Sequence, residues 1–599
     1  MRRNPQGRLE LTWMGKDSAL IPVEEGKYDY AWVDPDDPRA REVKSIEVLE
    51  QVGEVDGPTG ANENLLIIGD SGDALRSLAT IPEYHDKYAG QVKLVYIDPP
   101  FNTEQTFEHY ADQLEHSIWL TMMRDRIRDI KPLLAHDASV WVHLDDAEVH
   151  RMRVLMDEEF GPENFVATVL WQRVDNPSSR TSAKIVPSHD FLLVYSATSE
   201  FVARRRAVED LPSHYDRRDE NDQPYCSRSL RKAGAAARRE DRPSMWFPIQ
   251  SPTGVQVWPI RGDGTEGRWQ WGEEKVRRDY DKLDWLPSVR GGVEPFLRIY
   301  PPDDYTVPFH TWWTYSEVDS NRISKMEVKA LSPAEVPFAT PKPERLLARV
   351  MEVATMSGDL VLDFFGGSGT TAAVAHKMGR RWITVELQPS TVQKFMTPRL
   401  RKVVLGEDSG GVSVRRRRVP LNDLPEGMTP DEALGFNAAL TKVAKLLDGL
   451  DADTLKALRA ATRTKDETTT VWEGGGGFTV ARLGPSMYEV DDEDGTVYLS
   501  PEATNGAWSR AIAGQLKFTL TPDHPVFAGV RKRQRLAVID GVADETVVRT
   551  VVENLADNER AVIVAKGVVP EAAELLQSLS PGSRIKKAPA DIFPKGTVN

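Results

Sequence analysis

The sequence has a single cysteine, Cys226, among 599 residues. One cysteine excludes an intrachain disulfide and any zinc site built from several cysteines, and it is typical of a reducing compartment. Long apolar runs are also missing, since none approaches the ~18 residues that a membrane-spanning helix needs. The N-terminal residues lack the apolar core of a secretory signal. We therefore expect a cytoplasmic protein that makes no contact with a membrane.

An excess of positive charge is missing as well. The chain has 76 Lys+Arg against 91 Asp+Glu, which gives a net charge of −15. That balance alone argues against a nucleic-acid partner, because phosphate binding requires local positive charge. Arginine clusters at 204–206, 217–218, 238–239 and 415–418 could still form a basic surface. Net charge therefore leaves nucleic-acid binding open.

Hydrophobic residues make up 40% of the chain, which is typical of a globular protein, and its length predicts two to four domains. Strand and helix patterns alternate over 61–200 and again over 336–405, which predicts an α/β domain with a mostly parallel, Rossmann-like sheet. Residues 201–335 are rich in Arg, Gly, Pro and Trp with weak periodicity, and we interpret them as an inserted, loop-rich β domain. The remaining predicted segments are an N-terminal arm (1–60), a linker with helices (406–465) and a small C-terminal α/β domain (466–599).

The stretch LVYIDPPFN, residues 94–102, predicts a buried strand that stops abruptly. Its first four residues are apolar, as in a central strand of a parallel sheet. Proline cannot donate to a sheet ladder, so Pro99 and Pro100 end the strand at Asp98. The chain thus places a carboxylate, two rigid residues and the ring of Phe101 at the carboxyl end of a buried strand, where α/β proteins bind ligands.

A second motif, VLDFFGGSGTTAA at 361–373, predicts a strand ending in Asp363, a glycine turn and the start of a helix. Glycines at 367 and 369 permit a tight turn and close approach of a ligand. Glu386 ends the following strand, where an acid can accept hydrogen bonds from ribose hydroxyls. We expect an adenosine-containing cofactor here. Gly367, Gly369 and Ala372 also fit the G-x-G-x-x-A pattern of nicotinamide and flavin sites, so an oxidoreductase stays open.

Together the two motifs suggest chemistry at the exocyclic amine of a nucleobase. Such an amine is a poor nucleophile, because its lone pair is delocalised into the ring. Asp98 and the carbonyl of Pro99 could accept its two N–H bonds and expose the lone pair to an electrophilic methyl group. The prolines hold these acceptors in place before the substrate arrives, and Phe101 could stack on the base. No metal is required.

The DPPF motif followed by FGGSGTT resembles the amino-methyltransferase superfamily that uses S-adenosylmethionine. The DPPF form is similar to N6-adenine enzymes, whereas N4-cytosine enzymes more often carry Ser-Pro-Pro-Tyr. The catalytic motif precedes the cofactor motif by 265 residues, with the insert between them, and this permuted order resembles the β group. NLLIIGDSGDAL and FATPKPERLL agree with the likeness. The closest overall resemblance is to the modification (Mod) subunit of Type III restriction–modification systems and related phage-defence methylases.

This resemblance implies S-adenosyl-L-methionine as cofactor, and methylation of N6 of an adenine flipped out of double-stranded DNA. The C-terminal segment 466–599 could either stabilise or dimerise the protein, or dock a helicase, a nuclease or another defence-system subunit. The resemblance implies that 201–335 recognises the target and that the chain forms a homodimer in the bacterial nucleoid. It assigns catalysis to Asp98, Pro99, Pro100 and Phe101. It assigns cofactor binding to Asp70, Lys342, Asp363, Phe365, Gly367, Ser368, Gly369, Thr370 and Glu386.

Three other functions stay open: an N4-cytosine methyltransferase, a non-catalytic DNA-binding specificity subunit and an NAD-dependent oxidoreductase. Several lone residues have plainer interpretations. We interpret His143, Asp145 and Asp146 of the WVHLDD stretch as a pocket wall rather than a metal site. His189 and Asp190 are interpreted as structural. Four tryptophans are interpreted as core of the insert: Trp246, Trp258, Trp269 and Trp271.

Overall fold

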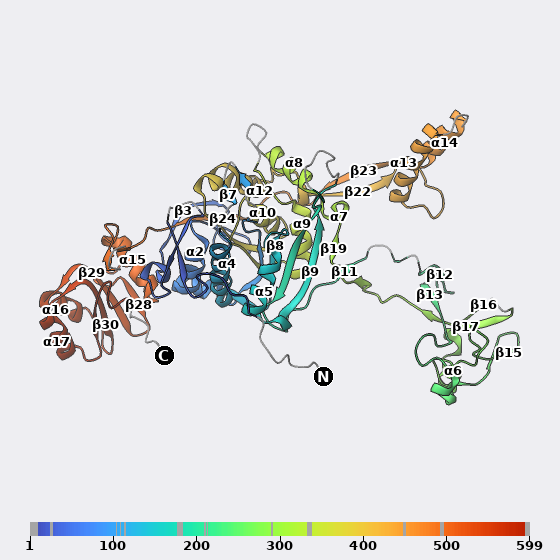
Figure 1. The fold of residues 1–599 in the computed structure, drawn as a ribbon, viewed down its shortest axis with the longest axis horizontal. Coiled ribbons are helices and arrows are strands. Elements are labelled where there is room, and N and C mark those ends of the chain that lie inside the picture. The colour runs from blue at the N-terminus through green and yellow to red at the C-terminus, as the bar shows by residue number, and fades with distance from the viewer. Residues whose placement is uncertain are drawn as a thin grey trace. The chain divides into compact units, whose positions relative to one another are not determined.

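The computed structural model describes residues 10–23, 28–102, 105–107, 110–112, 115–175, 184–208, 211–212, 214–288, 291–331, 338–446, 451–491 and 496–593. The chain forms two compact units (Figure 1). The central unit comprises 1–204 together with 310–599, and the insert comprises 205–309.

A ten-stranded sheet forms the core of the central unit, in the order β19-β9-β10-β8-β5-β20-β21-β4-β24-β3. The run from β8 to β24 is parallel throughout, and antiparallel pairings occur at β10 and β3. The predicted mostly parallel α/β sheet is therefore confirmed. Its strands are β3 (Ile46–Gly53), β4 (Leu65–Ile68), β5 (Val92–Ile97), β8 (Leu134–Leu144), β9 (Phe165–Gln172), β10 (His189–Ser196), β19 (Trp312–Trp313), β20 (Leu360–Asp363), β21 (Arg381–Glu386) and β24 (Gly477–Leu483).

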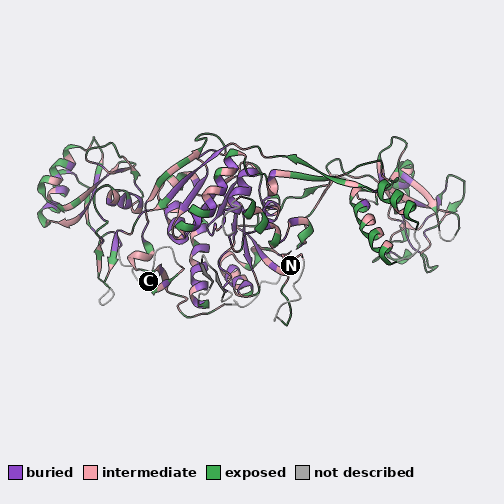
Figure 2. Ribbon diagram, turned by 90° about the horizontal axis from the view of Figure 1, so that it is seen from above, coloured by how far each residue is buried: buried purple, intermediate pink, exposed green. Residues whose placement is uncertain are grey.

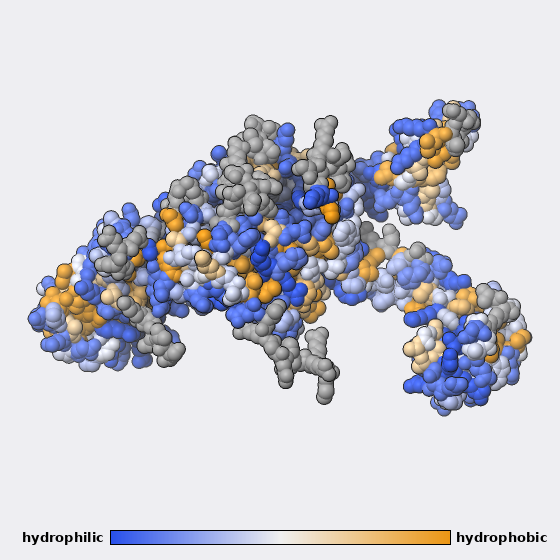
Figure 3. All heavy atoms as spheres, in the orientation of Figure 1, coloured by the Kyte–Doolittle hydropathy of each residue, from blue (hydrophilic) through white to orange (hydrophobic). Residues whose placement is uncertain are grey.

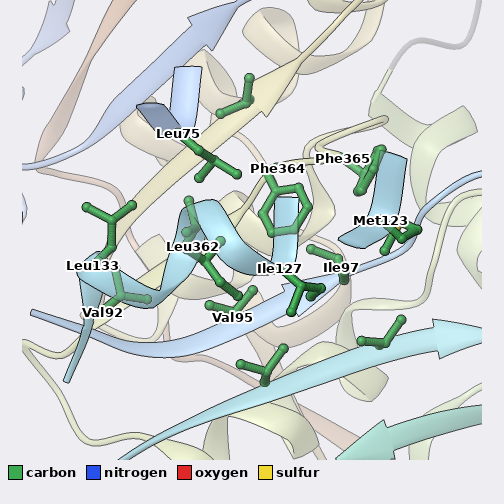
Figure 4. Packing of buried hydrophobic residues seen from close by; sticks show 14 of the residues in the cluster. Leu75, Val92, Val95, Ile97, Met123, Ile127, Leu133, Leu362, Phe364 and Phe365 are labelled. Atoms are coloured by element: carbon green, nitrogen blue, oxygen red, sulfur yellow. The ribbon is translucent and has the colours of Figure 1, made fainter. Parts of the chain in front are cut away.

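The helices of the central unit form two packed groups, α2, α4 and α5 in one and α9, α10 and α12 in the other. In the first group Met123 and Ile127 of α4 pack with Val95 and Ile97 of β5 and Leu362 of β20 (Figure 4). This cluster fixes the two central strands side by side. The helices are α1 (Pro38–Arg41), α2 (Ser71–Thr80), α3 (Pro82–Tyr88), α4 (His116–Ile130), α5 (Val149–Phe160), α7 (Tyr315–Val318), α8 (Asn321–Leu331), α9 (Glu344–Ala354), α10 (Thr370–Lys377), α11 (Pro389–Thr391) and α12 (Thr397–Leu405). Two short hairpins add β1 (Ala19–Pro22), β2 (Tyr30–Val33), β6 (Gln105–Phe107) and β7 (Tyr110–Asp112).

Two extensions leave the central sheet. One is an antiparallel ribbon of two strands whose far ends are joined through two helices, and Figure 2 colours it mostly exposed. Its elements are β22 (Val414–Pro420), α13 (Pro430–Leu446), α14 (Ala452–Ala461) and β23 (Thr464–Thr470). The other is a C-terminal α/β module around a five-stranded sheet, β27-β28-β29-β30-β31. It contains β25 (Tyr488–Val490), β26 (Val497–Leu499), α15 (Asn505–Gln515), β27 (Thr519–Leu520), β28 (Gly529–Arg531), β29 (Gln534–Ala543), α16 (Glu545–Glu553), β30 (Arg560–Val568), α17 (Pro570–Leu579) and β31 (Arg584–Lys587).

The insert is built from short strands around a small four-stranded sheet, β12-β13-β17-β16, as its sparse periodicity predicts. Phe247 and Trp269 are the largest side chains of its buried core. Its elements are β11 (Arg206–Ala207), β12 (Arg217–Arg218), β13 (Pro224–Ser229), β14 (Ile249–Gln250), β15 (Gln256–Val257), α6 (Glu273–Arg278), β16 (Leu283–Pro287), β17 (Val293–Ile299) and β18 (Thr306–Val307).

Three predicted boundaries differ from the structure. Residues 310–331 belong to the central unit rather than to the insert, because Trp313 is buried against Trp141 of β8. The N-terminal arm is partly core, since β3 forms an edge of the main sheet. The C-terminal domain begins later than 466, because β24 lies between β4 and β3 in the main sheet.

Strand β24 generates a prediction about stability. Phe478 is fully buried, and its ring centroid lies 5.7 Å from that of Trp382 on β21. Phe478→Ala should cost ~3–5 kcal/mol by leaving a cavity. We expect faster amide hydrogen exchange in β4 and β21, measured by mass spectrometry. The matched control is Phe518→Ala, which removes a buried ring of the C-terminal module. An effect of Phe478→Ala confined to residues after 484 would contradict the assignment of β24 to the central sheet.

Candidate active site

The parallel pairing of β5 with β20 brings the two sequence motifs together. Leu94 lies opposite Val361, and Val95 lies opposite Leu362. Since parallel strands end at the same edge of a sheet, Asp98 and Asp363 meet there, although 265 residues separate them. Both line a cavity of about 200 Å³. The predicted residues that line it are Asp98, Pro99, Pro100, Phe101, Lys342, Asp363, Phe365, Gly367, Ser368, Thr370 and Glu386.

Only one of the two carboxylate oxygens of Asp98 has a hydrogen-bond donor among the described residues. Lys342 Nζ donates to its Oδ2 at 2.6 Å, and this lysine is 9% exposed. The other oxygen, Oδ1, is buried and has no hydrogen-bond partner among the described residues. A buried carboxylate oxygen without a donor is costly to maintain, which indicates a group that awaits a ligand. Lys342 was predicted to bind the cofactor, but the structure places its ammonium on the predicted catalytic acid.

The proline corner, formed by Pro99 and Pro100, is held in place by a contact from the core. The indole of Trp119 in α4 donates to the carbonyl of Pro100 at 2.7 Å, inside the core. The ring of Phe101 stacks on His143 with centroids 5.8 Å apart, and the ammonium of Lys342 lies 5.0 Å from the Phe101 ring centroid. The backbone and the ring are therefore held in place by the protein itself.

A buried polar chain supports this wall. His143 Nδ1 and the Tyr96 hydroxyl lie 2.8 Å apart, and His143 Nε2 is 3.3 Å from Asp190. Asp190 in turn forms an ion pair with Arg173 at 2.9 Å. Burial lowers the pKa of His143 below its usual value. Among the described residues, no group of three His, Cys, Asp or Glu side chains is placed to hold a metal ion.

The glycine turn forms the other side of the cavity. Gly367 N donates to Glu386 Oε2 at 2.8 Å, and Phe365 N donates to Asp363 Oδ1 at 3.0 Å. Gly369 has φ +74°, and a Cβ there would lie 2.9 Å from Cγ of Met396. Glycine is thus required by both the backbone conformation and the space. Burial raises the pKa of Asp363 and that of Glu386, each to about 7.

Two predicted cofactor residues are not among the described residues that line the cavity. Gly369 is the N-cap of α10 and stands in the chain between Ser368 and Thr370, which both line the cavity. Asp70 caps α2 by accepting hydrogen bonds from Gly72 N and Asp73 N, and it forms an ion pair with Arg126 at 2.7 Å. The structure therefore gives Asp70 a role in holding α2 to α4.

Sequence reasoning missed several polar residues of the cavity. Arg173 follows β9 and Asn321 begins α8, and their side chains share the wall with Asp145 and Asp190. The interpretation of Asp190 as structural is incomplete, because this residue lines the cavity. Neither Arg173 nor Asn321 belongs to the two main motifs, but both lie in stretches that resemble segments of the family, VLWQR (169–173) and SNRISK (320–325). Position is a second signal, because Arg173 directly follows an apolar strand, as Asp98 does.

The interpretation of the insert tryptophans holds for two of the four. Trp269 is buried in the insert core and Trp271 packs against it. Trp246 and Trp258 instead contact each other near the surface, with ring centroids 5.0 Å apart. Trp258 is 40% exposed, and the guanidinium of Arg239 lies 5.2 Å from the Trp246 ring. The prediction that these two belong to the core is wrong.

Comparison with known proteins agrees with this geometry. The N6_N4_Mtase family model, described as DNA methylase, matches residues 92–397, which is half of the chain. The chain belongs to this DNA methylase family. The match begins at β5, includes the whole insert and ends in α12, so it contains both motifs and Lys342.

Three relatives of this DNA methylase illustrate the likeness. "Probable type III restriction-modification enzyme HindVI Mod subunit" of Haemophilus influenzae is 28% identical over 404 residues, covering 59% of this chain and 52% of the relative. The type III restriction-modification enzyme EcoPI Mod subunit of Escherichia phage P1 is 28% identical, covering 53% and 55%. The Type II methyltransferase M.KpnI of Klebsiella pneumoniae is 27% identical, covering 53% and 78%. The chain thus spans about half the length of the first two relatives.

The raised pKa of Glu386 predicts a pH dependence of stability in this DNA methylase. Between about pH 4.5 and 7 the unfolded chain releases the Glu386 proton while the folded chain keeps it. The free energy of unfolding should therefore fall across this window and level off above pH 7. Glu386→Gln removes this contribution and keeps an oxygen for Gly367 N. We expect the difference in unfolding free energy, wild type minus Glu386→Gln, to decline from pH 4.5 to 7 in urea titrations. A difference that rises with pH would contradict the assigned burial.

Proposed function

We propose that this chain is a site-specific DNA methyltransferase that uses S-adenosyl-L-methionine to methylate N6 of a flipped adenine, as the modification component of a restriction–modification or phage-defence system. The observation that carries the proposal is the free, buried Oδ1 of Asp98 in a proline-fixed corner beside the glycine turn. Family membership and the named Mod relatives support the substrate class.

The cavity fits S-adenosylmethionine. Gly366 and Gly367 line the cavity at the glycine turn, and Glu386 presents a carboxyl group that could accept hydrogen bonds from ribose hydroxyls. Three carboxyl groups, those of Asp98, Asp363 and Glu386, line the cavity and would favour a positively charged sulfonium. When bound there, S-adenosylmethionine supplies the methyl group on an electrophilic sulfonium centre.

The task of this chain's residues is to hold the amine. Asp98 Oδ1 accepts one N–H of the adenine amine, and the carbonyl of Pro99 is the candidate acceptor for the other. Both acceptors favour a nitrogen whose lone pair is exposed, so they stabilise the reacting geometry rather than the free base. Lys342 holds the Asp98 carboxylate by donating to Oδ2, so Oδ1 remains available as an acceptor.

The target base must leave the duplex, because its N6 cannot reach the cavity while it is stacked. Extrusion costs a few kcal/mol, and stacking on Phe101, worth ~1–3 kcal/mol, offsets part of that cost. Arg173, Asp190 and Asn321 provide hydrogen-bonding groups on the same wall for the ring edge of the base.

The other functions now have unequal support. Family membership argues against a nicotinamide-dependent oxidoreductase, which also gives Asp98 no role. N4-cytosine methylation needs the same acceptors, and the family name includes both chemistries. DPPF favours adenine through its resemblance to N6-adenine enzymes. The proposal also includes that the chain forms a homodimer and resides in the bacterial nucleoid. It further includes that the C-terminal module binds a helicase or nuclease partner. Among the described residues, no helix is long and apolar enough to cross a membrane.

Asp98→Ala tests the proposal directly. The variant should lose methyl transfer by at least ~10³-fold, because the amine loses its principal acceptor, while cofactor affinity changes little. Transfer is measured with tritiated cofactor and unmodified duplex DNA, and cofactor affinity by calorimetry. Digestion of the product to nucleosides distinguishes N6-methyladenine from N4-methylcytosine. Full activity of Asp98→Ala would refute the mechanism, and no transfer by the wild type on any DNA would favour the non-catalytic specificity subunit.

Lys342 generates a separate prediction. Lys342→Met removes a charge-assisted hydrogen bond worth ~1.5–3 kcal/mol, so kcat should fall by about ten- to a hundredfold with little change in the KM for cofactor. Lys342→Arg keeps the charge and should restore part of kcat. A raised cofactor KM with unchanged kcat would instead support the original assignment of Lys342 to cofactor binding.

A further inference from the structure

The ribbon of β22 and β23 has a composition that packing does not explain. Arg415, Arg416 and Arg417 are exposed, and nearly all of β23 is exposed as well. Because side chains alternate along a strand, both faces of this ribbon are polar. A two-stranded hairpin without an apolar face gains little stability from its own contacts. In Figure 3 the ribbon lies in a hydrophilic part of the surface.

The positive charge of the ribbon is only partly neutralised. Arg418 forms an ion pair with Asp466 at 2.6 Å. In the described part of the chain, none of Arg415, Arg416 and Arg417 forms an ion pair with a carboxylate within 4 Å. Burial raises the pKa of the Asp319 carboxyl group, and Arg416 lies near enough to that group to oppose the rise. Across the ribbon, Arg415 faces Thr469 and Arg416 faces Thr468, which are neutral, while Arg417 faces Glu467. Uncompensated charges on successive residues repel one another, and a polyanion would remove that cost.

The base of the ribbon is joined firmly to the active site. The carbonyl of Ser413 accepts from Val471 N at 2.9 Å, which closes the ribbon. Val412 N donates to Glu344 Oε2 at 2.9 Å. Glu344 lies two residues after Lys342, and its Oε1 accepts from Arg399 at 2.8 Å. Arg399 also donates to Thr370 Oγ1 in the glycine turn at 2.7 Å. The ribbon is thus anchored to the same buried network that holds the cofactor turn.

We propose that the β22–β23 ribbon is a second DNA-binding element, separate from the insert, in which the exposed Arg415, Arg416 and Arg417 contact the phosphates of duplex DNA. This inference rests on the proposed function for its choice of polyanion. Arginine binds phosphate through two parallel hydrogen bonds, and a two-stranded ribbon fits the major groove of B-form DNA. Phosphate contacts carry no sequence information, so the ribbon adds affinity and position, whereas the insert chooses the site.

The test measures binding of the full chain to a labelled duplex of ~40 base pairs and arbitrary sequence, by fluorescence anisotropy between about 50 and 300 mM NaCl. In the triple variant Arg415→Gln, Arg416→Gln, Arg417→Gln, the plot of log K against log salt should become less steep by about 2–3, because each lost phosphate contact removes ~0.9. Affinity at low salt should fall at least tenfold. The triple lysine variant should keep the wild-type slope.

The matched control replaces Lys532, Arg533 and Arg549 with glutamine, which removes the same charge from exposed positions of the C-terminal module. It should leave the salt slope within experimental error of wild type. Equal changes in both triple variants, or none in either, would overturn the ribbon proposal. So would a loss of affinity for single-stranded RNA with duplex binding intact. Thermal unfolding and cofactor binding establish that each variant folds.

The outcomes separate this inference from the proposed function. If the wild type transfers methyl groups and the ribbon variant binds duplex DNA normally, only the proposal of DNA binding by the ribbon is refuted. If the wild type binds duplex DNA through the ribbon but never transfers a methyl group, only the proposed methyltransferase activity is refuted. Absence of duplex binding by the wild type refutes both.

Discussion

The parallel pairing of β5 with β20 is the constraint on which the site depends. It places a strand that stops at two prolines beside a strand that stops at a glycine turn, with Asp98 and Asp363 at a shared edge. The apolar residues of both strands pack under α4, so neither end can move without disturbing the core. Rigidity of this edge matters, because acceptors that orient an amine must be in place before the base arrives.

Electrostatics divides the cavity into two functions. At the proline corner, Lys342 binds one oxygen of Asp98 and leaves the other as a buried acceptor. At the glycine turn, burial raises the pKa values of Asp363 and Glu386 to about 7. A cationic or hydroxyl-bearing ligand would stabilise these carboxyl groups. The ammonium of Lys342 thus contacts Asp98 and Phe101 at the proline corner, and the family match includes both parts of the cavity.

Much of this could be predicted from the sequence, because the signals were local. Apolar runs predicted the central strands, prolines predicted the end of β5, and glycines predicted the turn before α10. Relations between distant segments could not be predicted. Strand β24 joins the sheet next to β4, although more than 400 residues separate them, and only tertiary pairing shows it. Likewise, Lys342 lies in a stretch that resembles the family, but its contact with Asp98 depends on the fold. The surface contact of Trp246 with Trp258 has no periodic signal at all.

The central claim is that Asp98 holds an adenine amine for methylation. The most direct measurement is single-molecule sequencing of genomic DNA from cells that express this chain alone, beside cells that express Asp98→Ala at equal level. The account predicts N6-methyladenine at one recurrent motif in the wild type and none in the variant. Methylation at the same motif in both samples, or N4-methylcytosine in place of N6-methyladenine, would contradict it.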